Sequence, residues 1–270
     1  MDYQLAGKTA VITGAGGAIL GAVSRLLAAE GAQVAIWDLS PEPARATADA
    51  VTAAGGTALA VSCDVTSRSS VRAALDETLT SLQRVDILIN GAGGSRPATT
   101  TSSRLSFFDI EPDDIRSVMD LNYLGTVLCC QEVGRLMAGQ GSGSIVNVTS
   151  VAGVEPLTRA LAYSNGKAAA NSFTQWLAVH MAQNYSRDIR VNAVAPGFVL
   201  TDQNRFLLID AQSGAMTERG RQIMEAVPVA RYGTPQEVAQ LIVFLASDCA
   251  SFIHGAVIPV DGGFGAHSGV

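Results

Sequence analysis

Residues 9–21 read TAVITGAGGAILG, a short β-branched run followed by a glycine-rich stretch. The run at 9–13 is typical of a buried strand, and a helix is expected to begin near Ala18. Glycines let the backbone approach a pyrophosphate, while the helix N-terminus offers free N–H groups and a positive dipole end. The segment therefore predicts a phosphate-binding loop made by Gly14, Gly16, Gly17, Ala18 and Ile19.

A second strand, QVAIW (33–37), ends at Asp38. A carboxylate at this strand end accepts hydrogen bonds from the ribose hydroxyls of a dinucleotide and repels a 2′-phosphate. No Arg or Lys follows before Arg45. The sequence therefore predicts NAD(H), rather than NADP(H), as the cofactor.

The alternation of strand and helix patterns continues along the whole chain. Further β-branched runs occur at 58–62, 86–90, 144–148, 189–195 and 256–260. Stretches rich in Ala and Leu with helical spacing lie between them, and such alternation predicts a parallel sheet covered on both faces. We expect an α/β fold in three layers, with a seven-stranded, mostly parallel sheet and helices on both faces.

Two segments interrupt this rhythm. Residues 95–114 are rich in Ser and Thr, and residues from about 200 to 232 follow a Pro-Gly. Segments inserted after strand ends lie over the carboxyl edge of such a sheet, where ligands bind. Both are expected to be substrate-side loops, and the alternative for each is a surface excursion without a role.

Composition and charge exclude several classes of protein. The chain has 270 residues, of which 48% are apolar and 16% charged, so it can bury a core and is not disordered. Its formal net charge of −6 offers no basic stripe for phosphates, so we expect no nucleic-acid partner. No apolar run approaches the ~20 residues of a membrane span, and no cationic segment precedes an apolar one as in a secretory signal.

The cysteines and histidines show no metal-ligand spacing. The four cysteines are Cys63, Cys129, Cys130 and Cys249, and only three histidines occur. We therefore expect no metal site, reduced thiols and a cytoplasmic location.

Tyr163 and Lys167 stand four residues apart in a stretch with helical spacing. On a helix their side chains share one face. A neighbouring ammonium favours the phenolate, so Lys167 is expected to lower the pKa of Tyr163 toward working pH. Such a phenol can exchange a proton with a substrate hydroxyl or carbonyl oxygen.

Two further residues complete the expected catalytic group. Ser150 follows the strand at 144–148, and its hydroxyl is expected to hold the same substrate oxygen. Asn122, in DLNYLG (120–125), is expected inside the preceding helix, where it would anchor a water beside Lys167. A Tyr and a Lys at this spacing are common on surfaces, but the phosphate-binding loop, Asp38 and Ser150 together favour a catalytic role.

These motifs resemble those of the short-chain dehydrogenase/reductase family over essentially the whole chain. The matching segments are TGAGG (13–17), Asp38, CDVT (63–66), NGAGG (90–94), DLNYLG (120–125), NVTS (147–150), YSNGK (163–167), VNAVAPGFVLT (191–201) and PVDGG (259–263). The resemblance implies a single Rossmann-like domain over residues 1–270 with catalysis by Asn, Ser, Tyr and Lys. It also implies a homotetramer built from helices around 111–138 and 160–184 and from the last strand.

The same resemblance implies the remaining cofactor contacts. Asp64 and Val65 would flank the adenine, and Val199 and Thr201 would hold the nicotinamide amide. Lys167 would additionally bond the nicotinamide ribose. The other members of the expected cofactor site are Asn90 and Gly93 on the ribose side, together with Ala92, Tyr163, Pro196 and Gly197.

The chain departs from the common family pattern at two places. The usual TGxxxGxG would put glycines at positions 18 and 20, where this chain has Ala18 and Leu20. Leu20 is therefore expected to pack where a backbone usually approaches closely. The usual Asn-Asn-Ala-Gly reads NGAG at 90–93, so Gly91 removes one hydrogen-bonding side chain from the sheet edge.

The substrate class must be argued from the loops, because the fold alone says little. Only 6% of residues are aromatic, and the loop segments are polar. Several donors suit a hydroxylated, anionic substrate, since Arg can bind a carboxylate through two parallel N–H bonds. The candidate substrate-binding residues are Ser95, Arg96, Ser150, Arg159, Gln203 and Asn204.

A narrower resemblance, to the D-mannonate oxidoreductase (fructuronate reductase) branch, rests on more specific segments. These are FTQWLAVHMA (173–182), APGFVLTDQNR (195–205), ARYGTP (230–235) and PVDGGFGAHSGV (259–270). It implies interconversion of a ketone and a secondary alcohol on a sugar acid, D-fructuronate and D-mannonate or close relatives. Ser95-Arg96-Pro97 stands where Asn-His-Pro is expected, which leaves another sugar acid or a polyol open.

Three alternatives remain beside this interpretation. A polyol or sugar dehydrogenase differs only in its substrate. A ketoacyl reductase would use NADPH and a basic patch, which Asp38 and the acidic pI oppose. A non-catalytic NAD-binding protein is opposed by the intact set of Ser150, Tyr163 and Lys167.

Overall fold

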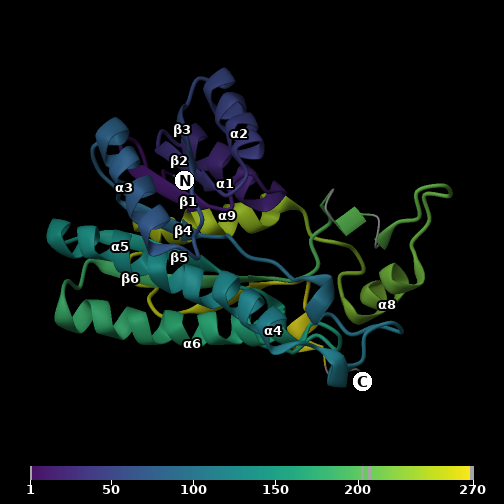
Figure 1. The fold of residues 1–270 in the computed structure, drawn as a ribbon. Helices are drawn as coiled ribbons and strands as arrows, with labels where there is room; N and C mark the ends of the chain where they lie inside the picture. Colours follow the sequence, from purple (N-terminus) through teal and green to yellow (C-terminus); the bar gives the residue numbers. More distant parts are fainter. Residues whose placement is uncertain (1, 202–203, 206–207, 268–270) are drawn as a thin grey trace.

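The computed structural model describes residues 2–201, 204–205 and 208–267. Within these residues seven strands form one sheet in the order β3-β2-β1-β4-β5-β6-β7 (Figure 1). All neighbouring strands run parallel. The strands are β1 (Thr9–Thr13), β2 (Gln33–Asp38), β3 (Thr57–Ser62), β4 (Ile87–Asn90), β5 (Gly143–Val148), β6 (Ile189–Pro196) and β7 (Val257–Val260). Each lies within a residue of its predicted bounds, so the predicted sheet is confirmed.

Helices cover both faces of the sheet, because the strands are apolar on both sides. One face packs against α1, α2 and α9, and the other against α3, α5 and α6. The three predicted layers are therefore confirmed. The α-helices are α1 (Ala18–Ala29), α2 (Pro41–Ala53), α3 (Arg68–Leu82), α4 (Pro112–Met119), α5 (Gly125–Gln140), α6 (Leu161–Asn184), α8 (Glu218–Ala226) and α9 (Pro235–Ala246).

The strand order reverses between β1 and β4, and this reversal creates the place where ligands bind in such sheets. The loops that follow these two strands touch each other. The hydroxyl of Thr13 accepts hydrogen bonds from the N–H groups of Gly91 (3.0 Å) and Ala92 (3.1 Å). Gly14 has φ +70°, and a Cβ there would lie 2.9 Å from Ala92 Cα, so the glycine is required for this approach.

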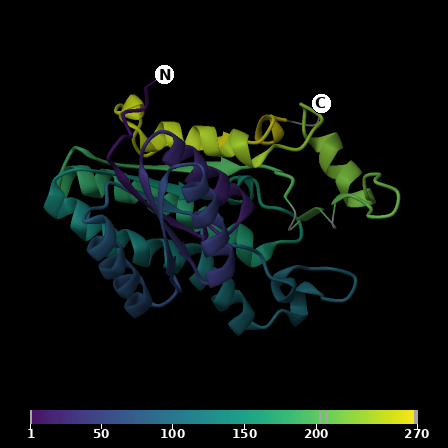
Figure 2. The same cartoon turned by 90° about the horizontal axis from the view of Figure 1, so that it is seen from above.

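Two segments project from this same end of the molecule. In Figure 2 the stretch around 95–111 and helix α8 both extend beyond the carboxyl ends of the strands. The first segment is tied to the approach to α6, because Thr101 N–H donates to Arg159 O (3.0 Å). No helix within the described part of the chain is long and apolar enough to cross a bilayer.

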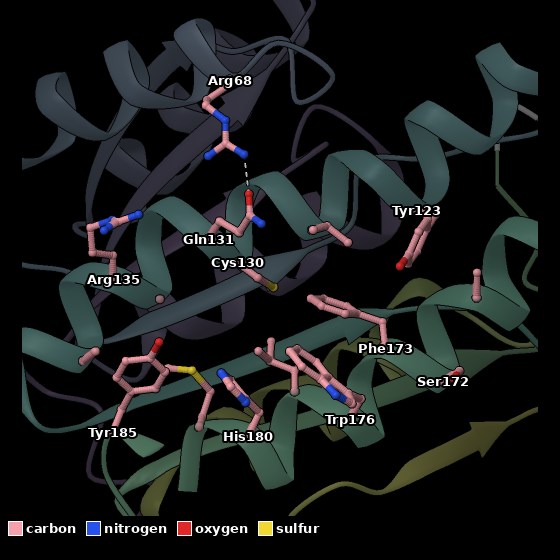
Figure 3. A pocket seen from close by; sticks show the side chains of 16 residues that line it. Arg68, Tyr123, Cys130, Gln131, Arg135, Ser172, Phe173, Trp176, His180 and Tyr185 are labelled. Atoms are coloured by element: carbon pink, nitrogen blue, oxygen red, sulfur yellow. Dashed lines mark hydrogen bonds between the residues drawn. The ribbon is translucent and has the colours of Figure 1, made fainter. Parts of the chain in front are cut away.

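A groove of about 1020 Å³ runs between α5 and α6 on the outer side of the molecule (Figure 3). Three stacked rings of α6 line the groove: Phe173 stacks on Trp176, and Trp176 stacks on His180. Trp176 and Tyr185 are each 58% exposed. The groove therefore presents unusually large apolar side chains to solvent.

Candidate active site

The glycine-rich loop leads into α1 without a capping side chain. Gly17 is the N-cap residue, and no side chain bonds to the first N–H groups of the helix. No acidic residue lies in the first turn. The helix end therefore keeps its partial positive charge and its N–H donors for an anion such as a pyrophosphate.

Asp38 lies at the carboxyl end of β2 beside this loop. Its Oδ2 accepts a hydrogen bond from Gly16 N–H (3.0 Å), and its Oδ1 accepts one from Ser40 N–H (2.9 Å). A Cβ on Gly16 would lie 2.9 Å from Asp38 Oδ2 and 2.6 Å from Pro43 Cβ. The absence of a side chain at Gly16 therefore allows the carboxylate to lie against the loop.

The two departures from the family pattern meet in space. Leu20 is buried, and a Cβ on Gly91 would lie 2.7 Å from both of its methyl carbons. The leucine side chain thus fills the volume that a side chain at position 91 would need. Leu20 packs as expected, and the missing side chain at Gly91 is a condition of that packing.

Lys167 lies on α6 and reaches the end of β5. Its Nζ donates a hydrogen bond to Val148 O (2.9 Å), and the residue is only 5% exposed. Burial lowers the pKa of Lys167 to about 8, because a low-dielectric environment disfavours the charged ammonium. The lysine is thus fixed in place, and it holds its proton less tightly than an exposed lysine does.

The expected effect of Lys167 on Tyr163 is wrong in this structure. Burial raises the pKa of Tyr163, and a hydrogen bond with Ser150 offsets only part of that rise. Lys167 Nζ lies 5.8 Å from the centroid of the phenol ring and bonds to Val148 O instead. Desolvation of the phenol therefore outweighs the ammonium, and Tyr163 stays protonated near neutral pH.

Ser150 immediately follows β5 and is brought beside Tyr163, as predicted. The residue is buried, and its Oγ accepts a hydrogen bond from Ala152 N–H (3.1 Å). A close approach fixes this segment against α6, because a Cβ on Gly153 would lie 2.6 Å from Lys167 C. Ser150, Tyr163 and Lys167 therefore converge at one place.

Asn122 lies in a single π-helical turn, Asp120–Leu124, between α4 and α5. Such turns often occur at functional sites. Its side chain donates to Gly94 O (2.8 Å) and Val118 O (2.9 Å) and accepts from Gly94 N–H (3.0 Å). The residue therefore holds the loop after β4 by its backbone, a role that the sequence did not predict.

Gly93 connects this loop to the catalytic group. A Cβ at Gly93 would lie 2.7 Å from Asn122 Oδ1 and 3.0 Å from Lys167 Nζ. Since the neighbouring Ala92 touches Gly14, the loop after β4 bridges the phosphate-binding loop and the lysine. All four expected catalytic residues thus lie around one edge of the sheet.

The other expected cofactor positions also lie along this edge, with one correction. Asp64 accepts hydrogen bonds from Thr66, and Val65 is buried against Gly125. The side chain of Asn90 does not line the site: its Nδ2 bonds to Asn147 inside the core, so only its backbone remains at the strand end. The carboxyl end of β6 and the loop after it hold Pro196, Gly197, Val199 and Thr201.

The expected substrate residues fall into two groups. Ser95 and Arg96 are exposed on the segment that follows β4, and Arg159 is exposed just before α6. These two stretches are joined by the hydrogen bond from Thr101 N–H to Arg159 O. Asn204 instead uses its amide to bond the backbone of Thr201 (2.9 Å) and Val199 (2.8 Å), so it stabilises the loop. Gln203 lies outside the described residues.

Sequence reasoning missed two structural contributors to the site. Thr13 bonds the loop after β4, and a threonine at the end of a strand gives only a weak signal of such a role. The acceptor of Lys167 is the carbonyl of Val148, which no side chain reveals.

Comparisons with known proteins find similarity over most or all of the chain. A family model described as Enoyl-(Acyl carrier protein) reductase matches residues 14–265. An uncharacterized oxidoreductase, UxuB, of Bacillus subtilis is 42% identical over 100% of this chain and 99% of its own length. D-threitol dehydrogenase of Mycolicibacterium smegmatis is 35% identical over 97% of this chain and 95% of its own length.

A solved structure is also similar from end to end. It is that of a protein from Haemophilus influenzae, provisionally named D-mannonate oxidoreductase, with bound NAD. The two structures agree with a TM-score of 0.93 at 38% identity and cover 98% of both chains.

Gly91→Ala should destabilise the protein, because the added methyl group would collide with buried Leu20. Overpacking of this kind costs about 1–3 kcal/mol. Leu20→Ala should relieve the collision, so the two effects on the free energy of unfolding should not add in the double variant. Urea unfolding of the four proteins measures this coupling, and simple additivity would contradict the proposed packing.

Lys167→Met should change how stability depends on pH. The folded protein holds the pKa of Lys167 at about 8, below the ordinary 10.5, so between these values only the unfolded chain binds the proton. Raising the pH from about 7 to about 10 should therefore stabilise wild type relative to the variant by about 2 kcal/mol. Urea midpoints at both pH values measure the difference, and a constant difference would contradict the lowered pKa.

Proposed function

The chain belongs to the short-chain dehydrogenase/reductase family, and on this premise we propose that it uses NAD(H) to interconvert a ketone and a secondary alcohol on a sugar acid. The proposed pair is D-fructuronate and D-mannonate or a close relative. One observation carries the proposal: the loop after β4 touches both the phosphate-binding loop at Gly14 and the lysine of the catalytic group. A dinucleotide lying along this edge would therefore reach Tyr163.

The residues at the edge fit a dinucleotide with a free 2′-hydroxyl. The uncapped N-terminus of α1 and the glycines before it suit a pyrophosphate, and Asp38 suits the ribose hydroxyls. The bound NAD of the Haemophilus influenzae protein supports the same choice. When bound, the dinucleotide supplies the hydride chemistry.

The chain's own residues would orient the substrate and transfer a proton. Ser150 and Tyr163 would donate hydrogen bonds to the ketone oxygen, and Tyr163 would give it a proton as the alcohol forms. The raised pKa of Tyr163 keeps the phenol protonated and suits this direction. Lys167 would hold the nicotinamide ribose, and Asn122 would fix the adjoining loop.

We assign substrate selection to the segments 95–114 and 200–232 of a single domain over residues 1–270. Arg96 is exposed on the first of these segments, and Arg159 is exposed just before α6, where its carbonyl accepts a hydrogen bond from Thr101 N–H. A guanidinium binds a carboxylate through two parallel bonds. Ser95 would bind a hydroxyl group. A polyol dehydrogenase is the second candidate, since D-threitol dehydrogenase is similar over nearly the whole chain.

We further propose that the protein is a cytoplasmic homotetramer. The groove between α5 and α6 carries exposed, stacked aromatic side chains, and a second copy of the same helices would cover them (Figure 3). The four cysteines are free thiols, which supports a reducing compartment.

A screen of hexuronates, aldonates and polyols with NAD(H) and NADP(H), followed by nicotinamide absorbance, tests the function. We expect the highest kcat/KM for a sugar-acid ketone with NADH. Tyr163→Phe should reduce kcat by about 10²- to 10⁴-fold, the usual contribution of a general acid, while NADH still binds.

Each other outcome of the screen has a definite meaning. A higher kcat/KM with NADPH would contradict the role of Asp38. A preference for polyols would favour the second candidate. Near-wild-type turnover by Tyr163→Phe would remove Tyr163 from the mechanism.

Trp176→Glu should weaken the assembly, because it places a charge in the apolar groove. Size-exclusion chromatography with light scattering should give a tetramer for wild type and smaller species for the variant. Ala50→Glu, on the exposed face of α2, adds the same charge elsewhere and should leave the tetramer intact. A wild-type monomer, or a tetrameric Trp176→Glu, would contradict this interface.

A further inference from the structure

Helix α6 is attached to the end of β5 at two places. Lys167 Nζ donates to Val148 O (2.9 Å), and the side chain of Asn147 donates from Nδ2 to Thr174 Oγ1 (2.9 Å). Lys167 and Thr174 are two helical turns apart, about 10 Å along the axis, and so face the same side. Adjacent residues of one strand thus hold the helix that carries Tyr163.

The second attachment is buried and continues into the sheet. Thr174 is 0% exposed, and its hydroxyl also donates to Ala170 O (2.8 Å). Asn147 Oδ1 accepts a hydrogen bond from Asn90 Nδ2 (2.8 Å), and these two asparagines are partners across β4 and β5. The amide of Asn147 is therefore held from both sides and cannot follow a sliding helix.

Apolar packing alone does little to fix the catalytic half of α6 along its axis. The buried apolar positions of that half are Ala162, Gly166 and Ala170, which offer little side chain to interlock with the sheet. The larger buried residues, Leu177 and Met181, lie beyond Thr174. The close approach of Gly153 to Lys167 and a hydrogen bond from Asn171 Nδ2 to Gly153 O (3.2 Å) also hold this half of the helix. The bonds to Val148 and Asn147 add directional contacts with the sheet itself.

We propose that Thr174 and Asn147 are positioning residues that set the axial register of α6, and through it the place of Tyr163 and Lys167 relative to Ser150. The proposal rests on the proposed oxidoreductase function. Losing the bond would leave Nδ2 of Asn147 without its partner in the core, and the cost of an unpaired buried donor disfavours a shifted register.

A matched contact elsewhere separates positioning from stability. In α3, Thr78 is equally buried, donates to Ala74 O (2.8 Å) and accepts from Trp37 Nε1 of β2 (3.0 Å). The arrangement is the same, a helix threonine bonded to its own helix and to a strand side chain. Helix α3, however, carries none of the expected catalytic residues.

The test compares Thr174→Val with Thr78→Val, because both remove a hydroxyl and keep the shape. Both should lower the Tm. Only Thr174→Val should lower kcat, by about 10- to 100-fold, since misplacement of reacting groups by about 1 Å has effects of this size. It should also shift the pH profile of kcat, with little change in KM for NADH, and Thr174→Ser should restore both.

The outcomes decide between positioning and support. Wild-type kcat and pH profile in Thr174→Val, with only the Tm lowered, would overturn the proposal, as would an equal loss of kcat in Thr78→Val. If Thr174→Val does not fold, the pair Thr174→Ala and Thr78→Ala is compared in the same way.

A separate readout distinguishes this proposal from the function on which it rests. If wild type reduces none of the carbonyl panel, the proposed function fails. Crystal structures of wild type and Thr174→Val then test the register of α6. A helix displaced along its axis, with Tyr163 moved away from Ser150, would support the positioning role of Thr174. An unmoved helix overturns it.

Discussion

The hydrogen bond between the Lys167 ammonium and the carbonyl of Val148 is the interaction on which the rest of the site depends. It joins the longest helix of the described chain to the carboxyl end of β5, which lies next to β4, where the strand order reverses. Burial makes the charged form costly and brings the pKa of Lys167 to about 8. A negative charge placed beside Lys167 would favour its ammonium form and raise this pKa.

The loop after β4 transmits this placement to the rest of the edge. Gly93 lies against Lys167 and Asn122, Ala92 lies against Gly14, and Gly91 makes room for Leu20. Each contact is possible because a side chain is small or missing. The two departures from the common family pattern, which look independent along the chain, are therefore one change in packing.

The sequence predicted the parts of the molecule that follow from local patterns. Apolar runs gave the strands to within a residue, and the glycine-rich turn placed the start of α1 at Ala18. The motifs also predicted that Ser150, Tyr163 and Lys167 lie together. Sequence reasoning failed where the outcome depends on burial or on the backbone: desolvation raises the pKa of Tyr163, Asn90 turns into the core, and Asn204 bonds its own loop. The first two effects are set by neighbours that are distant in the chain, and the third depends on the backbone conformation of the loop, which side-chain patterns do not reveal.

The hydrogen bond from Gly16 N–H to Asp38 has a consequence for how a ligand is received. The loop is already ordered by a carboxylate that a ribose would later contact, so much of the conformational entropy is lost during folding instead of during association. An incoming ribose hydroxyl would need to share or displace one existing partner, and the net gain in enthalpy from that contact would be small. Asp38 would then select its cofactor mainly by repelling a ribose that carries a 2′-phosphate, and only to a smaller extent by binding tightly a ribose with free hydroxyl groups.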